Sequence, residues 1–223
     1  MPISTKIETG RMEPGAVEPG NHHGNRSREQ RARESMQRFT LLLNQTRIIP
    51  ALRSPEFLIP SSLAPGKIVY FLFGNPENTA EMMELITDAG KVPIINIDLA
   101  AGFARDYAAV SYLAHHQVQG IISTHPEPLR VARDFGLFAI KRTFLLDSAA
   151  VHSALRSLDQ FMPDALEVLP AMAAPHIIHR LHQMYPTLPV IAGGLISTLR
   201  EIENLISQGI DSVSVSARDL WVA

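Results

Sequence analysis

Eight short apolar runs, separated by segments with helical signals, constrain the fold of this chain more than any other feature. The runs are rich in β-branched residues and almost continuously hydrophobic, which is typical of parallel strands covered on both faces. They occupy residues 46–52, 68–73, 92–98, 119–124, 137–142, 165–170, 188–194 and 211–216. This pattern predicts an α/β fold with a parallel sheet.

The segments between the runs carry the start and stop signals of helices. Several open on Ser, Thr or Pro and close on Gly. The clearest lie at 76–90, 105–116, 126–136 and 197–209. Alternating strands and helices with short connections imply right-handed parallel crossovers. We therefore predict a (β/α)8 TIM-barrel-like single domain with some trimmed helices, and keep a doubly wound open sheet as the alternative.

The first 40 residues differ from the rest. They are rich in Pro, Gly, Glu, Arg and Asn and have few large apolar residues, so we expect a disordered or partly helical basic tail over 1–40 and a folded domain over 41–223. The stretch 25–39 could form a short helix with its arginines exposed. Such an arm serves either as a solvated extension or as a contact for RNA or another partner.

Charge and composition narrow the class of protein. The net charge of −2 divides into +2 for residues 1–40 and −4 for 41–223, so the acidic body argues against non-specific nucleic-acid binding. The absence of cysteine from the sequence excludes disulfides and thiolate chemistry. The sequence has no run of apolar residues long enough for a membrane span and no apolar secretion signal near its start, so we expect a cytoplasmic protein.

Polar residues and glycines stand where the predicted strands end. In a TIM barrel these ends converge on one face, where functional groups gather. The positions are Arg53, Gly74, Asn75, Asp98, Thr124, His125, Lys141, Arg142, Glu167, Gly193, Gly194, Ser214 and Ser216. We expect the site at this face.

Gly193 and Gly194 end the seventh predicted strand, and Ser214 and Ser216 lie in the eighth. The loops after these two strands hold a phosphate in many TIM barrels. Glycines let backbone N–H groups approach an anion without interference from a Cβ atom. The pattern favours a phosphate site, and the alternative is a simple turn into the next helix.

Other strand-end side chains offer charge. Asp98 could accept hydrogen bonds from a ligand hydroxyl or pair with Lys141 or Arg142, of which only one can point inward because strand faces alternate. With Glu167 and His125, Asp98 and Lys141 would also serve an isomerase or aldolase acting on a small phosphorylated metabolite. His176, His179 and His182 have helical spacing without an accompanying carboxylate, so we expect a solvated helix face and no metal site.

Seven motifs in a fixed order carry a resemblance to one family. They are IIPALR (48–53), NIDLAAG (96–102), GIISTH (120–125), the spaced residues of 132–148 that end in FLLDS, EVLP (167–170), IAGGLI (191–196) and SVSVSARDLW (212–221). The chain resembles glycerol-3-phosphate-responsive antiterminators, regulators of bacterial glycerol-uptake operons. The resemblance covers about residues 46–222.

The resemblance implies a TIM-barrel-like regulatory domain that senses glycerol 3-phosphate, binds a messenger RNA leader, performs no catalysis and needs no cofactor. It implies phosphate binding by Gly193, Gly194, Ser214 and Ser216. The polyol end or the mouth would be served by Asp98, Arg53, Lys141, Arg142, Glu167 and His125. Candidate RNA contacts are Arg130, Arg133, Arg142 and the tail, and oligomeric state is left open, with a homo-oligomer as one alternative.

Three positions depart from the family pattern: Asn96 replaces a histidine, His125 a more basic residue, and Ala171 a glycine. These departures motivate a further alternative, a paralogue that senses another phosphate ester.

Overall fold

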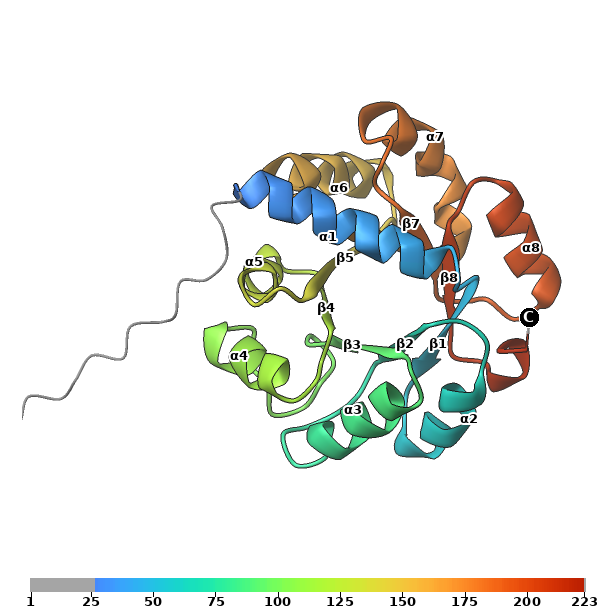
Figure 1. Ribbon diagram of the computed structural model, residues 1–223. Coiled ribbons are helices and arrows are strands. Elements are labelled where there is room, and N and C mark those ends of the chain that lie inside the picture. Colours follow the sequence, from blue (N-terminus) through green and yellow to red (C-terminus); the bar gives the residue numbers. More distant parts are fainter. Residues whose placement is uncertain (1–26, 223) are drawn as a thin grey trace, which may run out of the picture.

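The computed structural model describes residues 27–222, which form a closed barrel of eight parallel strands surrounded by helices (Figure 1). Each strand pairs with its sequence neighbours, and β8 pairs with β1, so the sheet has no edge. The strands are β1 (Ile48–Leu52), β2 (Ile68–Phe71), β3 (Val92–Asn96), β4 (Gly120–Ser123), β5 (Phe138–Phe144), β6 (Ala165–Leu169), β7 (Val190–Gly193) and β8 (Ser212–Val215). The predicted barrel is confirmed, and the open sheet is excluded.

Helices connect successive strands along the outside of the barrel. They are α2 (Leu58–Leu63), α3 (Thr79–Asp88), α4 (Tyr107–His115), α5 (Pro126–Asp134), α6 (Ser148–Gln160), α7 (Pro175–Met184) and α8 (Leu199–Ser207). The expected trimming is visible in the six residues of α2 and in the single 3-10 turn Arg218–Leu220 that follows β8. Within residues 27–222, no helix is long and apolar enough to cross a membrane.

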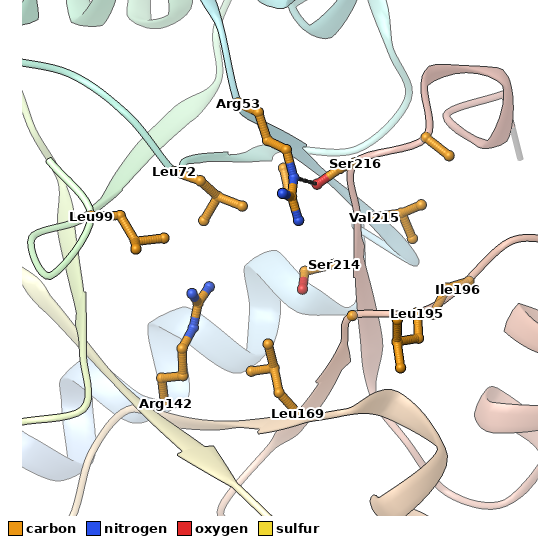
Figure 2. A pocket seen from close by; sticks show the side chains of 13 residues that line it. Arg53, Leu72, Leu99, Arg142, Leu169, Leu195, Ile196, Ser214, Val215 and Ser216 are labelled. Carbon is orange, nitrogen blue, oxygen red and sulfur yellow. Dashed lines mark hydrogen bonds between the residues drawn. The ribbon is translucent and has the colours of Figure 1, made fainter.

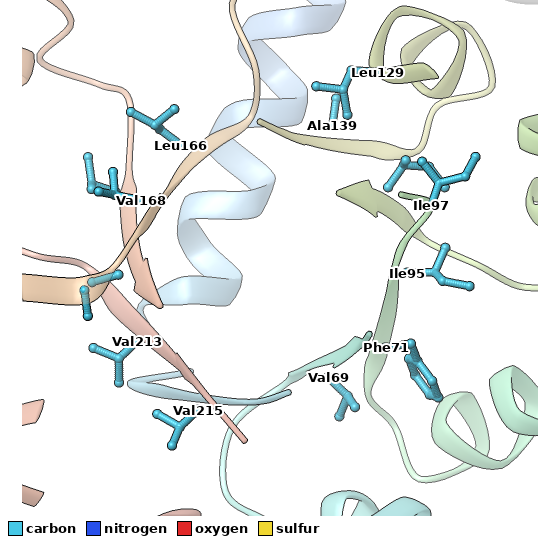
Figure 3. Close-up of a cluster of buried hydrophobic side chains, with 14 of the residues drawn as sticks. Val69, Phe71, Ile95, Ile97, Leu129, Ala139, Leu166, Val168, Val213 and Val215 are labelled. Carbon is cyan, nitrogen blue, oxygen red and sulfur yellow. The ribbon is translucent and has the colours of Figure 1, made fainter. Parts of the chain in front are cut away.

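The alternation of strand side chains creates two apolar layers. Outward-facing residues such as Val213 and Val215 of β8 pack between the barrel and its helices (Figure 3). Inward-facing residues fill the barrel, among them Ile49, Tyr70 and Ile140. The sequence SVSV of β8 therefore places valines in the outer layer and serines inside, because consecutive side chains on a strand point to opposite faces.

Helix α1 (Arg28–Leu43) closes the amino-terminal end of the barrel (Figure 1). Ser27 caps its start, and the Ser27 side chain accepts a hydrogen bond from the backbone N–H of Gln30. Phe39 is fully buried among the inward-facing residues, and its ring centroid lies 5.0 Å from that of Phe138. Leu43 is buried in the same cluster, so the end of the helix fills the barrel interior.

The boundary expected at residue 40 thus falls inside a helix that packs against the barrel. Basic residues dominate the first part of α1, but its end has an apolar face formed by Phe39, Leu42 and Leu43. Only Phe39 lies within residues 1–40, and the two leucines lie just beyond the expected boundary. The arginines of α1 at 28, 31, 33 and 38 are exposed, as expected for the helix. Of the tail expected to be disordered or partly helical over 1–40, residues 28–40 are helical. Residues 1–26 lie outside the described residues.

Two leucines of α1 test whether this helix stabilises the barrel. Leu43 is 2% exposed and Leu41 is 61% exposed. We expect Leu43→Ala to lower the free energy of unfolding by about 2–5 kcal/mol, because it leaves a cavity in the barrel interior. Leu41→Ala, the matched control, should change it by no more than about 0.5 kcal/mol. Urea denaturation measures both, and equal effects would mean that α1 contributes nothing through its buried face.

Candidate functional site

A cavity of about 670 Å³ opens at the carboxyl ends of the strands, and we call it the mouth cavity (Figure 2). Strand ends and the loops after them supply its walls. Its lining residues are Ala51, Arg53, Leu72, Leu99, Arg142, Leu169, Gly194, Leu195, Ile196, Ser214, Val215, Ser216 and Ala217. Five residues singled out from the sequence therefore meet here: Arg53, Arg142, Gly194, Ser214 and Ser216.

Two arginines make the mouth cavity cationic. Figure 2 shows the guanidinium groups of Arg53 and Arg142 pointing into it from opposite walls. Nε of Arg53 donates to Oγ of Ser216 at 3.2 Å, and Nε of Arg142 donates to Oε2 of Glu167 at 2.7 Å. Each bond fixes a guanidinium at its Nε, so that the Nη donors of both groups are presented to the cavity. Planar guanidinium groups suit the oxygens of phosphates.

Glu167 lies beneath the mouth cavity and is completely buried. Its carboxylate accepts the bond from Arg142 on Oε2 and a bond from Oγ of Ser214 on Oε1, the latter at 2.7 Å. A buried charge is costly unless it is paired and hydrogen-bonded, and these two donors meet that need. Glu167 therefore orients one cation of the cavity and one hydroxyl.

Gly193 leaves space for the hydrogen bond between Ser214 and Glu167. A Cβ atom at this position would lie 2.4 Å from Oγ of Ser214 and 3.2 Å from Oε1 of Glu167. The side chain of any larger residue would thus occupy the position of the Ser214–Glu167 hydrogen bond. The geometry explains Gly193 by the packing around Glu167, whereas the sequence suggested direct contact with a phosphate.

The loop after β7 has an unusual backbone at the edge of the cavity. Gly194 has a φ of 79°, and Leu195 next to it has a φ of 60°. The left-handed region is readily adopted by glycine but is uncommon for leucine. The Leu195 side chain is nevertheless 83% exposed, so burial of that side chain does not offset the strain. The pair turns the chain away from the barrel and leaves Gly194 in the cavity wall.

Asp98 belongs to a separate polar cluster. It accepts hydrogen bonds from Oγ of Ser123 at 2.8 Å, from the backbone N–H and the hydroxyl of Thr124 at 2.7 and 2.8 Å, and from Nε of Arg105 at 2.9 Å. Burial alone would raise the pKa of Asp98, but these bonds together outweigh burial and lower it. Its ion-pair partner is Arg105, where the sequence suggested Lys141 or Arg142.

Lys141 and Arg142 point to opposite faces of β5. Arg142 faces the mouth cavity, whereas Lys141 lies outside the barrel and donates to the backbone carbonyl of Thr124. Burial lowers the pKa of Lys141, and the nearby carboxylate of Asp98 opposes this effect. His125 is exposed at the start of α5. Among the described residues, the wall of the mouth cavity does not include Asp98, Lys141 or His125.

The apolar residues of the mouth cavity were not predicted from the sequence, because only polar side chains and glycines were expected at this face. Leu72 and Leu169 stand two residues after Tyr70 and Glu167, which face the interior, so strand alternation would have placed them at the mouth. Leu99 and Leu195 lie in loops, where no periodicity applies. These side chains narrow the cavity and lower the polarity around the two arginines.

Two further polar groups are buried within the barrel. The hydroxyl of Tyr70 and Nδ2 of Asn96 have no hydrogen-bond partner within the part of the chain that the structure describes. Burial, followed by the charge of Glu167, raises the pKa of Tyr70, so its hydroxyl keeps its proton. Oδ1 of Asn96 accepts from the backbone N–H of Asp98 at 3.0 Å, which fixes the loop that carries the carboxylate.

The histidine triplet lies on the outer side of α7. His176 and His179 are exposed and His182 is half-buried. No three His, Cys, Asp or Glu side chains within residues 27–222 form a group that could hold a metal ion.

Comparison with known proteins gives consistent matches. The sequence profile of a family described as "Glycerol-3-phosphate responsive antiterminator" matches residues 48–221. A solved glycerol uptake operon antiterminator regulatory protein from Listeria monocytogenes is 28% identical, with a TM-score of 0.73 over 80% of this chain and 95% of that one. A glycerol uptake operon antiterminator-related protein from Thermotoga maritima is 27% identical, with a TM-score of 0.71 over 79% of this chain and 98% of that one.

A curated relative, the uncharacterized protein YgcP of Escherichia coli K12, is 29% identical over 81% of this chain and 94% of its own length.

The contact between Gly193 and Ser214 can be tested by a double-mutant cycle. We expect Gly193→Ala to lower the free energy of unfolding by about 1–3 kcal/mol, because the new methyl group collides with Oγ of Ser214. The same substitution in a Ser214→Ala background should cost clearly less, because the nearest colliding atom is gone. Urea denaturation of the four proteins gives the coupling energy, and identical costs in both backgrounds would contradict this assignment.

Proposed function

Because the chain belongs to the family of glycerol-3-phosphate responsive antiterminators, we propose that it is an effector-controlled RNA-binding regulator of the cytoplasm. Its effector is a small phosphate monoester, glycerol 3-phosphate first among them. The observation that carries the proposal is the convergence of Arg53 and Arg142 on one cavity at the carboxyl ends of the strands.

The phosphate group is assigned to Arg53, Arg142, Ser216 and the backbone at Gly194. Two guanidinium groups supply the charge that an anion requires, and they do so in a partly apolar cavity where charges are weakly screened. Gly194 adds a stretch of backbone without a side chain in the cavity wall. Asp98 and Lys141 are engaged in their own cluster, so we assign them no contact with the effector.

RNA binding requires cations elsewhere on the surface. Nη2 of Arg133 donates to the carbonyl of Met162 at 2.6 Å, and its guanidinium carbon lies 4.5 Å from the ring centroid of Phe161. Arg142 is held by Glu167. The better candidates are the exposed Arg130 of α5 and the exposed arginines of α1. Helix α1 lies at the end of the barrel opposite the mouth cavity (Figure 1). Effector binding can change the affinity for RNA only if the protein has two conformations, one that binds RNA and one that does not, and the effector binds one of them more tightly.

Binding of the effector is tested first by heat stability. Glycerol 3-phosphate at a hundred times its Kd should add roughly 2.7 kcal/mol to the free energy of unfolding. This gain corresponds to about 5–10 °C in melting temperature, at roughly 2–4 °C per kcal/mol. Glycerol, which lacks the charge, should give no shift.

Two exposed arginines, Arg53 in the wall of the mouth cavity and Arg105 outside it, form a matched pair of variants. Each donates one hydrogen bond through Nε, Arg53 to Ser216 inside the cavity and Arg105 to Asp98 outside it. We expect Arg53→Gln to weaken glycerol 3-phosphate by about tenfold or more in calorimetric titrations, as for a lost hydrogen bond to a charged group. Arg105→Gln should leave the affinity unchanged. Equal losses in both variants would argue for general charge attraction in place of a phosphate site.

The regulatory role is tested with the leader transcript of a glycerol-uptake operon from the genome that encodes this chain. Glycerol 3-phosphate should change the affinity of the wild-type protein for this RNA by a measurable factor, and Arg53→Gln should require more effector for the same change. An unrelated RNA of equal length is the control. If the effector binds but is converted, as followed by phosphorus NMR, the protein is an enzyme and the regulatory proposal fails.

A further inference from the structure

Two serines line the mouth cavity, Ser214 in β8 and Ser216 directly after it, and they have opposite hydrogen-bonding roles. Oγ of Ser214 donates to Oε1 of Glu167 at 2.7 Å, whereas Oγ of Ser216 accepts from Nε of Arg53 at 3.2 Å. A hydroxyl carries one proton and two lone pairs. Ser214 has therefore committed its only proton to Glu167, and Ser216 has kept its own.

The direction of the Ser214 bond is fixed by its partner. A carboxylate offers only lone pairs, so the proton on the shared bond comes from the serine. Turning the hydroxyl of Ser214 toward a ligand would strip Oε1 of this hydrogen bond in a residue that is fully buried. Oε2 is already occupied by Arg142. The Ser214 oxygen consequently meets a ligand as an acceptor.

A dianionic phosphate has no proton to give to such an acceptor. It is complemented by Ser216, which is free to donate, and by the guanidinium of Arg53 beside it. Ser214 needs a ligand O–H group. The two serines are two residues apart at the end of β8, roughly 7 Å for extended backbone, a separation that a phosphate oxygen and a hydroxyl on a short carbon chain can bridge.

We propose that Ser214, oriented by Glu167, accepts a hydrogen bond from a hydroxyl of the effector, while Ser216 and Arg53 bind its phosphate. This assignment rests on the proposed function and deepens it, because it separates the serines that the sequence placed together as phosphate ligands. It orients the effector with its phosphate among Ser216 and the two arginines, Arg53 and Arg142, and with a hydroxyl of its carbon chain at Ser214. It also makes Glu167 a positioning residue, which acts on the ligand through Ser214 and Arg142.

The test compares two esters of the same length, glycerol 3-phosphate and n-propyl phosphate, which lacks both hydroxyls. Titrations at about pH 8 keep both phosphates dianionic, since the second pKa of a phosphate monoester is about 6. The wild-type protein should bind glycerol 3-phosphate about tenfold more tightly, the worth of a hydrogen bond in a site built for it. Ser214→Ala should remove this preference and leave the affinity for propyl phosphate unchanged.

Ser216→Ala is the matched control and should weaken both esters by the same factor. If Ser214→Ala does not fold, Ser214→Cys tests the same point, because a thiol sulfur is a weak acceptor. Equal weakening of both esters by the Ser214 variant would identify Ser214 as a phosphate contact and overturn the assignment. Equal wild-type affinities would overturn hydroxyl selection while the phosphate site stands. Failure of the wild-type protein to bind either ester at millimolar concentration would overturn the proposed function as well.

Discussion

The buried carboxylate of Glu167 is the constraint on which the rest of the mouth cavity depends. A charge with no access to water must be matched by donors, and the donors here come from the neighbouring strand β5 and from β8 across β7. Their bonds determine which way Arg142 and Ser214 face. The strand between them contributes a glycine because no side chain fits beside this pair. A single buried carboxylate thus constrains one residue on each of three strands, β5, β7 and β8. The ligand itself need not contact this carboxylate.

The barrel beneath supplies the rigidity that this arrangement needs. Its interior is filled by branched and aromatic side chains, and α1 closes the amino-terminal end with Phe39 and Leu43. A filled interior resists the small shifts that would break hydrogen bonds of 2.7 Å. The barrel therefore opens at the mouth cavity on its carboxyl-terminal end, and α1 covers its amino-terminal end.

The fold could be predicted from the sequence because it depends on features that repeat along the chain. Every strand of the barrel begins and ends within a few residues of an apolar run, and the glycines after α3, α5 and α8 mark helix ends as predicted. The membership of α1 in the barrel was hidden, because three apolar residues at the end of a polar segment do not alter its composition. Their burial depends on the barrel they enter.

The mouth cavity was less accessible to prediction. Strand ends identified Arg53, Arg142, Gly194, Ser214 and Ser216 as neighbours, but not Leu99 or Leu195, which reach the cavity from loops. Nor could periodicity decide between Lys141 and Arg142, because residues 137–140 before them are apolar on both faces of the strand. The glycine at 193 has an evolutionary consequence. The side chains of Ser214 and Glu167 fill the space beside Gly193. Relatives with a larger residue at position 193 should therefore lack the hydroxyl at position 214, and substitutions at positions 167, 193 and 214 should occur together.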